Sequence, residues 1–230
     1  MRDRIDGKPR RALVVVTRVP EPGKTKTRMM PDLTPVQCAE LHACMLRDLS
    51  AMCAAVARRG VDVLVAYAPE GARDEVGAYF TGAAGFFAQR GSALGERLRN
   101  AVEEVLSRGY ARVAVIGADA PEVGEGDVLR ALDALDGCDV ALGPADDGGY
   151  YLIAMSALHP EAFSLSSYGH ERVFAETASC LRRAGLTCER LRVVADIDRR
   201  CDAEGLLERA DRDDVVARLH SVRYLKELGW

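Results

Sequence analysis

Short apolar segments alternate with amphipathic helical patterns along the whole chain, and this alternation is the strongest constraint on the fold. Strands separated by helices are typical of a mostly parallel sheet with helices on its faces. The expected strands are Ala12–Thr17, Val61–Ala68, Ala111–Gly117, Asp139–Leu142, Tyr150–Met155 and Glu189–Val194. The expected helices are one beginning at Thr34, then Gly95–Ser107, Gly126–Leu135, Arg172–Ala184 and a final pair from Asp202 onward. The sequence therefore predicts an α/β fold.

The connection between Leu142 and Tyr150 bears on the type of sheet, because it is short and rich in Asp and Gly. Such a connection is too short for the helical crossover that parallel neighbours require, so one of the two strands is expected to be antiparallel or displaced. No repeat, low-complexity tract or Pro/Gly/Ser-rich linker divides the chain. We therefore expect a polar tail over residues 1–10 and one domain over residues 11–230, with a mixed, mostly parallel sheet flanked by helices.

The first long helix carries a start signal and a core face. Thr34 suits the cap position, Pro35 fits the first turn and Gln37 completes a capping box. Apolar side chains then repeat at helical spacing, which predicts a buried stripe. These side chains are Leu41, Met45, Leu49, Met52 and Val56.

Composition limits the classes of function that the chain can have. Apolar residues make up 48% of the 230 residues, charged residues make up 29%, and the net charge is −4. A chain without a basic surplus is not expected to be a general nucleic-acid binder. A membrane span needs a run of about twenty apolar residues, and the sequence contains none. The charged first residues lack a signal-peptide pattern. We therefore expect a cytoplasmic protein with neither a nucleic-acid partner nor a membrane span.

A basic loop follows directly on the first expected strand. Its candidates for nucleotide and phosphate binding are Arg18, Gly23, Lys24, Lys26, Thr27 and Arg28. Ligands bind at the carboxyl ends of strands in α/β sheets, and closely spaced Arg and Lys side chains suit a polyanion with neighbouring phosphates. A solvated basic loop is the alternative, but three cations within five residues, from Lys24 to Arg28, favour a phosphate site.

The basic loop is not a Walker A motif, although Gly23–Thr25 resembles the end of one. Arg18 stands where that motif requires its first glycine. Pro20 and Pro22 also lack the backbone N–H groups with which a P-loop wraps its phosphates.

Two aspartates that follow expected strands, Asp119 and Asp198, are candidate metal ligands. Mg²⁺ and Mn²⁺ prefer hard oxygen ligands, and Mg²⁺ is often held by one or two carboxylates together with substrate phosphates. In an extended segment Asp196 points the same way as Asp198, so one of them can reach a metal while the other braces it. Capping of the next turn or helix is the alternative role for both candidates.

A second loop, Gly143–Tyr150, combines turn residues with carboxylates. The candidates for a substrate-binding loop are Asp146, Gly148, Gly149 and Tyr150, and Asp147 is a candidate general base. Consecutive glycines permit a close backbone approach or a positive φ, and carboxylates can accept hydrogen bonds from a sugar or acceptor hydroxyl. A hairpin turn explains the same residues equally well, and both explanations stay open.

Two further segments contribute candidates. Residues 91–98 have the pattern of a helix N-terminus whose N–H groups face an anion, so Gly95 and Arg97 are candidates for phosphate binding. Pairing of Arg97 with Glu96 or exposure at the surface is the alternative. His170 lies in a polar loop before a helix and is a candidate substrate contact.

Five segments carry a resemblance to a known family: VPEPGKTKTRM, GSALGERL, GADAPEV, GPADDGGYYLI and ADIDRRCDAEGL. Over residues 12–206 the chain resembles the bacterial cofC-like glycosyltransferases, or nucleotide-diphospho-sugar transferases, which have the GT-A fold. It is more distantly similar to 2-phospho-L-lactate guanylyltransferase and to the molybdenum cofactor guanylyltransferases. The resemblance implies nucleotide and phosphate binding by Lys24, Lys26 and Arg28, and a divalent metal on Asp119 with Asp198 as its partner.

The chain departs from this family pattern at three places. Arg18 stands in place of a lysine and keeps the charge, whereas Ser92 and Ala93 stand where the family has an aspartate. Residues 168–170 replace a Trp-Ser/Gly-Thr run. Acceptor specificity is therefore not carried over from the family.

Two transferase reactions fit these residues. The first is glycosyl transfer from a nucleotide-diphospho-sugar to a small-molecule acceptor, with Mg²⁺ or Mn²⁺ as cofactor and Asp147 and Asp119 as catalytic residues. The alternative is nucleotidyl transfer from a nucleoside triphosphate, like that of a guanylyltransferase, with release of pyrophosphate. A non-catalytic nucleotide-binding regulator is a third possibility, and the presence of both Asp119 and Asp198 argues against it.

Overall fold

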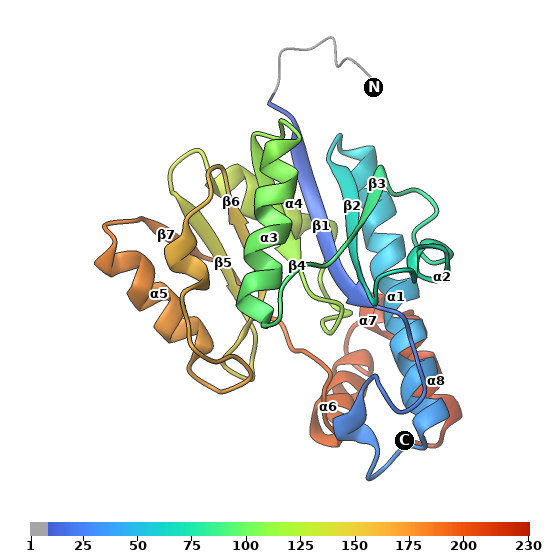
Figure 1. Ribbon diagram of the computed structural model, residues 1–230. Coiled ribbons are helices and arrows are strands. Elements are labelled where there is room, and N and C mark those ends of the chain that lie inside the picture. Colours follow the sequence, from blue (N-terminus) through green and yellow to red (C-terminus); the bar gives the residue numbers. More distant parts are fainter. Residues whose placement is uncertain (1–8) are drawn as a thin grey trace.

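Apolar strands form one seven-stranded sheet at the centre of the computed structural model, which describes residues 9–230 (Figure 1). In chain order the strands are β1 (Arg11–Arg18), β2 (Asp62–Ala68), β3 (Gly85–Ala88), β4 (Arg112–Ile116), β5 (Val140–Pro144), β6 (Tyr150–Met155) and β7 (Cys188–Arg190). Their order across the sheet is β3-β2-β1-β4-β6-β5-β7. Only β6 runs antiparallel to its neighbours, β4 and β5. The predicted α/β fold with a mixed, mostly parallel sheet is confirmed. Of the predicted polar tail, residues 1–8 lie outside the described residues.

The helices are α1 (Pro35–Arg58), α2 (Arg73–Gly77), α3 (Leu94–Ser107), α4 (Glu125–Ala134), α5 (Val173–Arg183), α6 (Arg200–Ala210), α7 (Asp214–Ala217) and α8 (His220–Glu227), with the 3₁₀ helices η1 (Thr27–Met29) and η2 (Pro160–Phe163). Helices α1 to α5 pack along the sheet, and α6, α7 and α8 form a separate group against α1 (Figure 1). The predicted capping box of α1 is present: the Gln37 N–H donates to Thr34 Oγ1 at 3.3 Å, and the Thr34 N–H donates to Gln37 Oε1 at 2.9 Å. Within residues 9–230 no helix is long and apolar enough to cross a membrane.

The C-terminal region corrects one expectation, because it contains three helices and not a pair. After α6 the chain turns, and the Val215 N–H donates to the Asp213 carboxylate at 2.7 Å. This cap starts the short helix α7 before α8 begins. The sequence prediction also missed α2 and the edge strand β3, which are short elements without a long periodic pattern.

The last strand is shorter than the predicted Glu189–Val194. Strand β7 ends at Arg190. Beyond Arg190 the segment is joined to β5 by single backbone hydrogen bonds, and Val194 forms an isolated bridge with Ala145, the residue that follows β5. The Leu191 N–H donates to the Leu142 carbonyl at 2.8 Å, and the Val194 N–H donates to the Pro144 carbonyl at 3.1 Å. The chain then leaves the sheet toward α6, and this departure carries Asp198 to the carboxyl end of β4.

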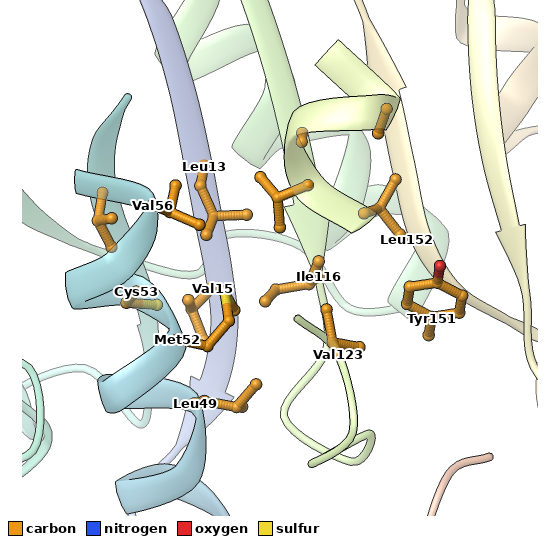
Figure 2. Close-up of a cluster of buried hydrophobic side chains, with 14 of the residues drawn as sticks. Leu13, Val15, Leu49, Met52, Cys53, Val56, Ile116, Val123, Tyr151 and Leu152 are labelled. Carbon is orange, nitrogen blue, oxygen red and sulfur yellow. The ribbon is translucent and has the colours of Figure 1, made fainter. Parts of the chain in front are cut away.

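Alternating side chains along the central strands fill a core on each face of the sheet. Leu13 and Val15 of β1 pack with α1 and α4 on one face, where Figure 2 shows α1 side chains such as Leu49 and Val56 against the sheet. Ala12 and Val14 of the same strand pack with α3 and α5 on the other face. Because both faces are covered, functional groups are displaced to the ends of the strands.

A third hydrophobic cluster joins the C-terminal helices to the rest of the fold. Side chains from α6, α7 and α8 pack against the N-terminal half of α1 and against Met29 of the basic loop. The buried Asp48 carboxylate of α1 accepts hydrogen bonds from the His220 N–H at 2.6 Å, the Ser221 N–H at 3.0 Å and the Ser221 hydroxyl at 2.7 Å. Asp48 therefore caps α8 and fastens it to α1.

Replacing Asp48 by alanine is expected to destabilise the protein by about 3 kcal/mol, because three donors lose their buried acceptor. The Ser221→Ala variant removes only one of these donors and should lose about 1 kcal/mol. Urea unfolding of both variants measures the difference. Equal, small losses in the two variants would contradict the role assigned to Asp48.

Candidate functional site

The basic loop after β1 is folded back on itself by local hydrogen bonds. The Lys24 N–H donates to the Glu21 carbonyl at 3.0 Å, and the Thr25 hydroxyl donates to the same carbonyl at 3.3 Å. Gly23 has a φ of 80°, which a glycine adopts without strain. This turn directs the following residue, Lys26, toward the carboxyl end of the sheet.

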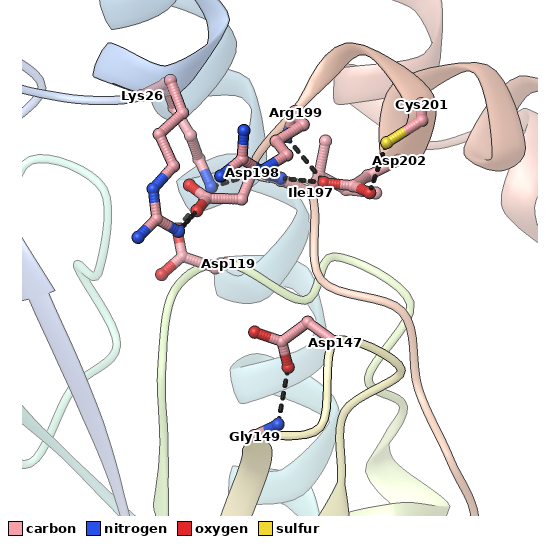
Figure 3. A network of polar contacts seen from close by, with 10 residues as sticks. Lys26, Asp119, Asp147, Gly149, Ile197, Asp198, Arg199, Cys201 and Asp202 are labelled. Carbon is pink, nitrogen blue, oxygen red and sulfur yellow. Dashed lines mark hydrogen bonds and ion pairs between the residues drawn. The ribbon is translucent and has the colours of Figure 1, made fainter. Parts of the chain in front are cut away.

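Lys26 is the buried centre of the loop. Its side chain is 3% exposed, and its ammonium group forms an ion pair with the Asp119 carboxylate and donates a hydrogen bond to the Ile197 carbonyl (Figure 3). The backbone of Lys26 has a φ of 49°, which is uncommon outside glycine. A buried charge and a left-handed backbone are each unfavourable alone, so the contacts with Asp119 and Ile197 hold the lysine in place.

Arg28 makes a second ion pair beside the first. Its guanidinium group binds the Asp198 carboxylate. Asp198 is itself positioned at the start of α6, where its N–H donates to the Asp202 carboxylate at 2.9 Å. The structure therefore places two of the predicted phosphate-binding cations directly on the two predicted metal ligands.

The carboxylates at this site differ in their affinity for a proton. Desolvation raises the pKa of Asp119, but the charge and hydrogen bond of Lys26 outweigh it and hold the pKa below its ordinary value. For Asp196, burial followed by the carboxylates of Asp147 and Asp119 raises the pKa to about 7. Lys26 therefore favours the ionised form of Asp119, whereas Asp196 takes up a proton more readily.

The donor set at this site fits a hard divalent cation that is completed by a ligand. Asp119 and Asp198 provide carboxylate oxygens, which Mg²⁺ and Mn²⁺ prefer, and Figure 3 shows them in the same small region. Across residues 9–230, no group of three or more His, Cys, Asp or Glu side chains is arranged to hold a metal ion. Two carboxylates therefore suit an ion that also binds phosphate oxygens of a substrate, and not a closed protein cage.

A cleft of about 570 Å³, the basic cleft, opens beside Lys26 at the carboxyl ends of β1 and β2. Four cationic side chains line it, together with neutral polar groups and both aspartates. The charged and polar lining residues are Thr17, Arg18, Lys24, Thr25, Lys26, His42, Gln89, Arg97, Asp119 and Asp198. The predicted roles of Arg18, Lys24 and Arg97 in phosphate binding stay predictions, but all three residues face this one cleft.

A second cleft of about 340 Å³, the tyrosine cleft, lies between α3, β4, β6 and the loop before α5. Its residues include Arg28, Leu94, Leu98, Asp147, Gly149, Tyr150, Tyr168, His170, Val173 and Asp196. The basic cleft and the tyrosine cleft share Val16, Asp119 and Asp198. The two clefts therefore meet at the ion pairs.

Several predicted site residues lie outside the linings of both clefts: Gly23, Thr27, Gly95, Asp146 and Gly148. The glycines among them serve close packing or a turn. A Cβ on Gly95 would lie 2.8 Å from the Tyr168 ring, and a Cβ on Gly148, whose φ is 89°, would lie 1.9 Å from the Glu171 carbonyl oxygen. The absence of a side chain at Gly95 and Gly148 thus lets Tyr168 and the Glu171 backbone pack closely against them in the walls of the tyrosine cleft.

Asp147 is a turn residue whose side chain also lines a cleft, and its role as general base stays a prediction. Its Oδ1 accepts the Gly149 N–H at 2.7 Å, which is the hydrogen bond of a turn (Figure 3). The same side chain lines the tyrosine cleft. The turn therefore holds a carboxylate in the wall of the tyrosine cleft.

The N-terminus of α3 is capped by its own glutamate. The Glu96 carboxylate accepts the Ser92 N–H at 2.8 Å, the Ser92 hydroxyl at 2.7 Å and the Ala93 N–H at 3.4 Å. These hydrogen bonds, led by the one from the Ser92 hydroxyl, lower the pKa of Glu96. Arg97 does not pair with Glu96; its Nε donates to the Gly91 carbonyl at 3.0 Å.

Among the residues of the basic cleft that sequence reasoning missed are Gln89 and His42. Gln89 follows the unpredicted strand β3, and its Nε2 donates to the Thr17 carbonyl at 2.6 Å and to the Ala66 carbonyl at 3.0 Å. His42 is 4% exposed, and its Nδ1 has no hydrogen-bond partner among the described residues. Because His42 lies on the apolar stripe of α1, its spacing could not distinguish a core residue from a cleft residue.

Burial, followed by the positive charge of Lys26, lowers the pKa of His42 to about 4. The unfolded chain binds a proton near pH 6.5, so acidification between pH 6.5 and pH 4 favours unfolding. His42→Gln should therefore lessen the loss of stability between pH 7 and pH 5 by about 2 kcal/mol. Urea unfolding at both pH values tests this, with His220→Gln, at an exposed position, as the control. The same pH dependence in all three proteins would contradict the assignment.

Comparison with solved structures places this fold among nucleotide-using transferases. The crystal structure of a "putative nucleotide-diphospho-sugar transferase" from Desulfovibrio desulfuricans G20 is 30% identical, with 94% of each chain covered and a TM-score of 0.84. CMP:2-keto-3-deoxy-manno-octonic acid synthetase in complex with CTP is 16% identical, with 86% of this chain and 96% of the other covered and a TM-score of 0.55. 4-Diphosphocytidyl-2C-methyl-D-erythritol synthase from Anaerococcus prevotii DSM 20548 is 8% identical, with 84% and 94% covered and a TM-score of 0.54.

The comparisons confirm the predicted class, a nucleotide-using transferase, but they do not specify the reaction. A search of curated proteins finds no match. A family profile described as "Uncharacterized protein conserved in bacteria (DUF2064)" matches residues 51–170, about half of the chain. The protein belongs to this DUF2064 family.

Proposed function

We propose that the protein transfers a glycosyl group from a nucleotide-diphospho-sugar to a small-molecule acceptor. The observation that carries this proposal is the meeting of two chemically different clefts at Asp119 and Asp198. The basic cleft suits an anionic donor, and the tyrosine cleft suits an acceptor with an apolar body. Two substrates that exchange a group must be held at one point, in contact and correctly oriented.

The donor diphosphate is assigned to Lys26 and Arg28, with further positive charge from Arg18, Lys24 and Arg97. In the structure Lys26 and Arg28 are ion-paired with carboxylates at the junction of the clefts. Cations in this position can bind phosphate oxygens in charge-assisted hydrogen bonds while they remain close to their carboxylates. The same contacts would stabilise the negative charge that develops on the diphosphate as it leaves.

Asp119 and Asp198 are assigned to a divalent metal, Mg²⁺ or Mn²⁺. When bound, the metal supplies charge neutralisation to the departing diphosphate. The residues of the chain hold the carboxylates ready for this role: Lys26 keeps Asp119 ionised, and Asp202 fixes the backbone of Asp198.

Asp147 is assigned the role of general base. The acceptor oxygen forms a bond to the anomeric carbon of the donor sugar, and the bond between that carbon and the diphosphate oxygen breaks. The diphosphate leaves with the electron pair, and the acceptor proton passes to the Asp147 carboxylate. The hydrogen bond from the Gly149 N–H orients the carboxylate but leaves its second oxygen for the acceptor.

The alternative function is nucleotidyl transfer. The cationic side chains of the basic cleft favour it, because a triphosphate would satisfy them at least as well as a diphosphate. In that reaction an acceptor oxygen attacks the α-phosphorus, and pyrophosphate leaves with the electron pair. The same residues would bind the phosphates, and the two reactions differ in the bond that breaks.

Calorimetric binding of ligands that share one base tests the proposed reaction. With Mg²⁺ present, we expect a nucleoside diphosphate or a nucleotide sugar to bind more tightly than the triphosphate of the same base. The free nucleoside serves as the control for contacts with the base and ribose alone. Release of pyrophosphate from a triphosphate with a phosphorylated acceptor, together with no cleavage of any nucleotide sugar, would establish the alternative function.

A further inference from the structure

The walls of the tyrosine cleft are largely apolar. Leu94 and Leu98 contribute from α3, Ile153 from β6 and Val173 from the start of α5. Leu94 is 48% exposed, although it is a large hydrophobic side chain beside a cleft. Leu98, Ile153 and Val173 are buried, so Leu94 is the side chain of these four that stays exposed, as is typical of a binding site for an apolar ligand surface.

Buried phenol hydroxyls belong to three tyrosines of this cleft, Tyr150, Tyr151 and Tyr168. The Tyr151 ring packs into the core beside α1 and α4, whereas the hydroxyls of Tyr150 and Tyr168 lie against each other, and neither has a partner outside this pair among the described residues. A hydroxyl has one donor and two acceptor lone pairs, so this pair keeps hydrogen-bonding capacity for a ligand that brings a polar atom into the cleft. The cleft therefore matches an amphipathic ligand and not a purely apolar one.

The charges around the cleft exclude one class of ligand. Asp147 and Asp196 line it, and within residues 9–230 neither carboxylate is ion-paired with a cationic side chain. The arginine of the cleft, Arg28, is bound to Asp198. The Nε2 of His170 lies 4.0 Å from the carboxylate of Glu176. Arg28 serves either Asp198 or the donor diphosphate, and the metal proposed at Asp119 and Asp198 serves the diphosphate, so within residues 9–230 no cationic side chain of this cleft is left over for an anionic acceptor.

We propose that the acceptor carries no negative charge: it is an uncharged or cationic molecule with an apolar body and a hydroxyl group. This inference rests on the proposed function, in which the tyrosine cleft holds the acceptor. The apolar body lies against Leu94, Leu98 and Val173, and the hydroxyl is directed to Asp147. Tyr150 and Tyr168 bind a second polar group of the same molecule. A phosphorylated or carboxylated acceptor would place its charge beside the Asp147 carboxylate, which no cationic side chain of the described residues neutralises.

Three benzylic probes of equal size test the charge preference. They are 1,4-benzenedimethanol, 4-(aminomethyl)benzyl alcohol and 4-(hydroxymethyl)benzoate, which share a ring and a hydroxyl and differ in charge. Binding is measured by saturation-transfer NMR titration of the protein saturated with a nucleoside diphosphate and Mg²⁺. The neutral and cationic probes should bind about tenfold more tightly than the carboxylate. In an Asp147→Asn, Asp196→Asn double variant this difference should shrink, and Tyr150→Phe should weaken all three probes.

The possible failures of the test are distinguishable. A carboxylate probe that binds as tightly as the neutral probe would overturn the inference, as would the absence of binding by all three probes to a protein that holds its nucleotide. Failure of every nucleotide to bind in the preceding calorimetric step would instead contradict the proposed function. Filling the cleft by a Leu94→Trp substitution, at the exposed apolar position of its wall, should abolish probe binding and leave nucleotide binding unchanged. Binding that persists in this variant would place the probes elsewhere and overturn the inference.

Discussion

The ion pair between Lys26 and Asp119 is the interaction on which the rest of the site depends. It joins three distant parts of the chain, because the Lys26 ammonium group also binds the Ile197 carbonyl ahead of α6. A lysine side chain that is 3% exposed is costly to bury unless its ammonium group meets an opposite charge and further hydrogen-bond acceptors. Asp119 and Ile197 provide both, and they thereby fix the basic loop over the carboxyl ends of β1 and β4.

The C-terminal helices support this site structurally. They complete a hydrophobic cluster under the basic loop, and the segment that leads into them supplies Ile197 and Asp198. Asp48 fastens the last of these helices to α1. The site is therefore assembled from both ends of the sequence and from β4 between them. Cations and carboxylates are in contact in the structure without a ligand, so a nucleotide bound as proposed would meet a prepared set of charges.

The sequence predicted the parts of this structure that depend on local pattern. The long helix α1 has a capping box and an apolar stripe, and the central strands are buried runs bounded by turns, so both were found. Strand β3 and helix α2 are too short to show a period. His42 was indistinguishable from a core residue, because its position in the cleft depends on the loop that crosses above α1. Spacing identified the cations and carboxylates as candidates, but their direct pairing required the three-dimensional contact of residues about a hundred or more positions apart.

The affinity of a nucleoside diphosphate for variants of Lys26 and Arg28, measured by calorimetry with Mn²⁺ present, tests the central claim most directly. Methionine at position 26 keeps the length of the side chain without its charge, and glutamine at position 28 keeps hydrogen-bonding capacity without charge. If these cations hold the diphosphate, each substitution should weaken binding by roughly 1.5–3 kcal/mol, about tenfold or more, with the affinity of the free nucleoside little changed. Undiminished affinity of both variants for the diphosphate would contradict the account.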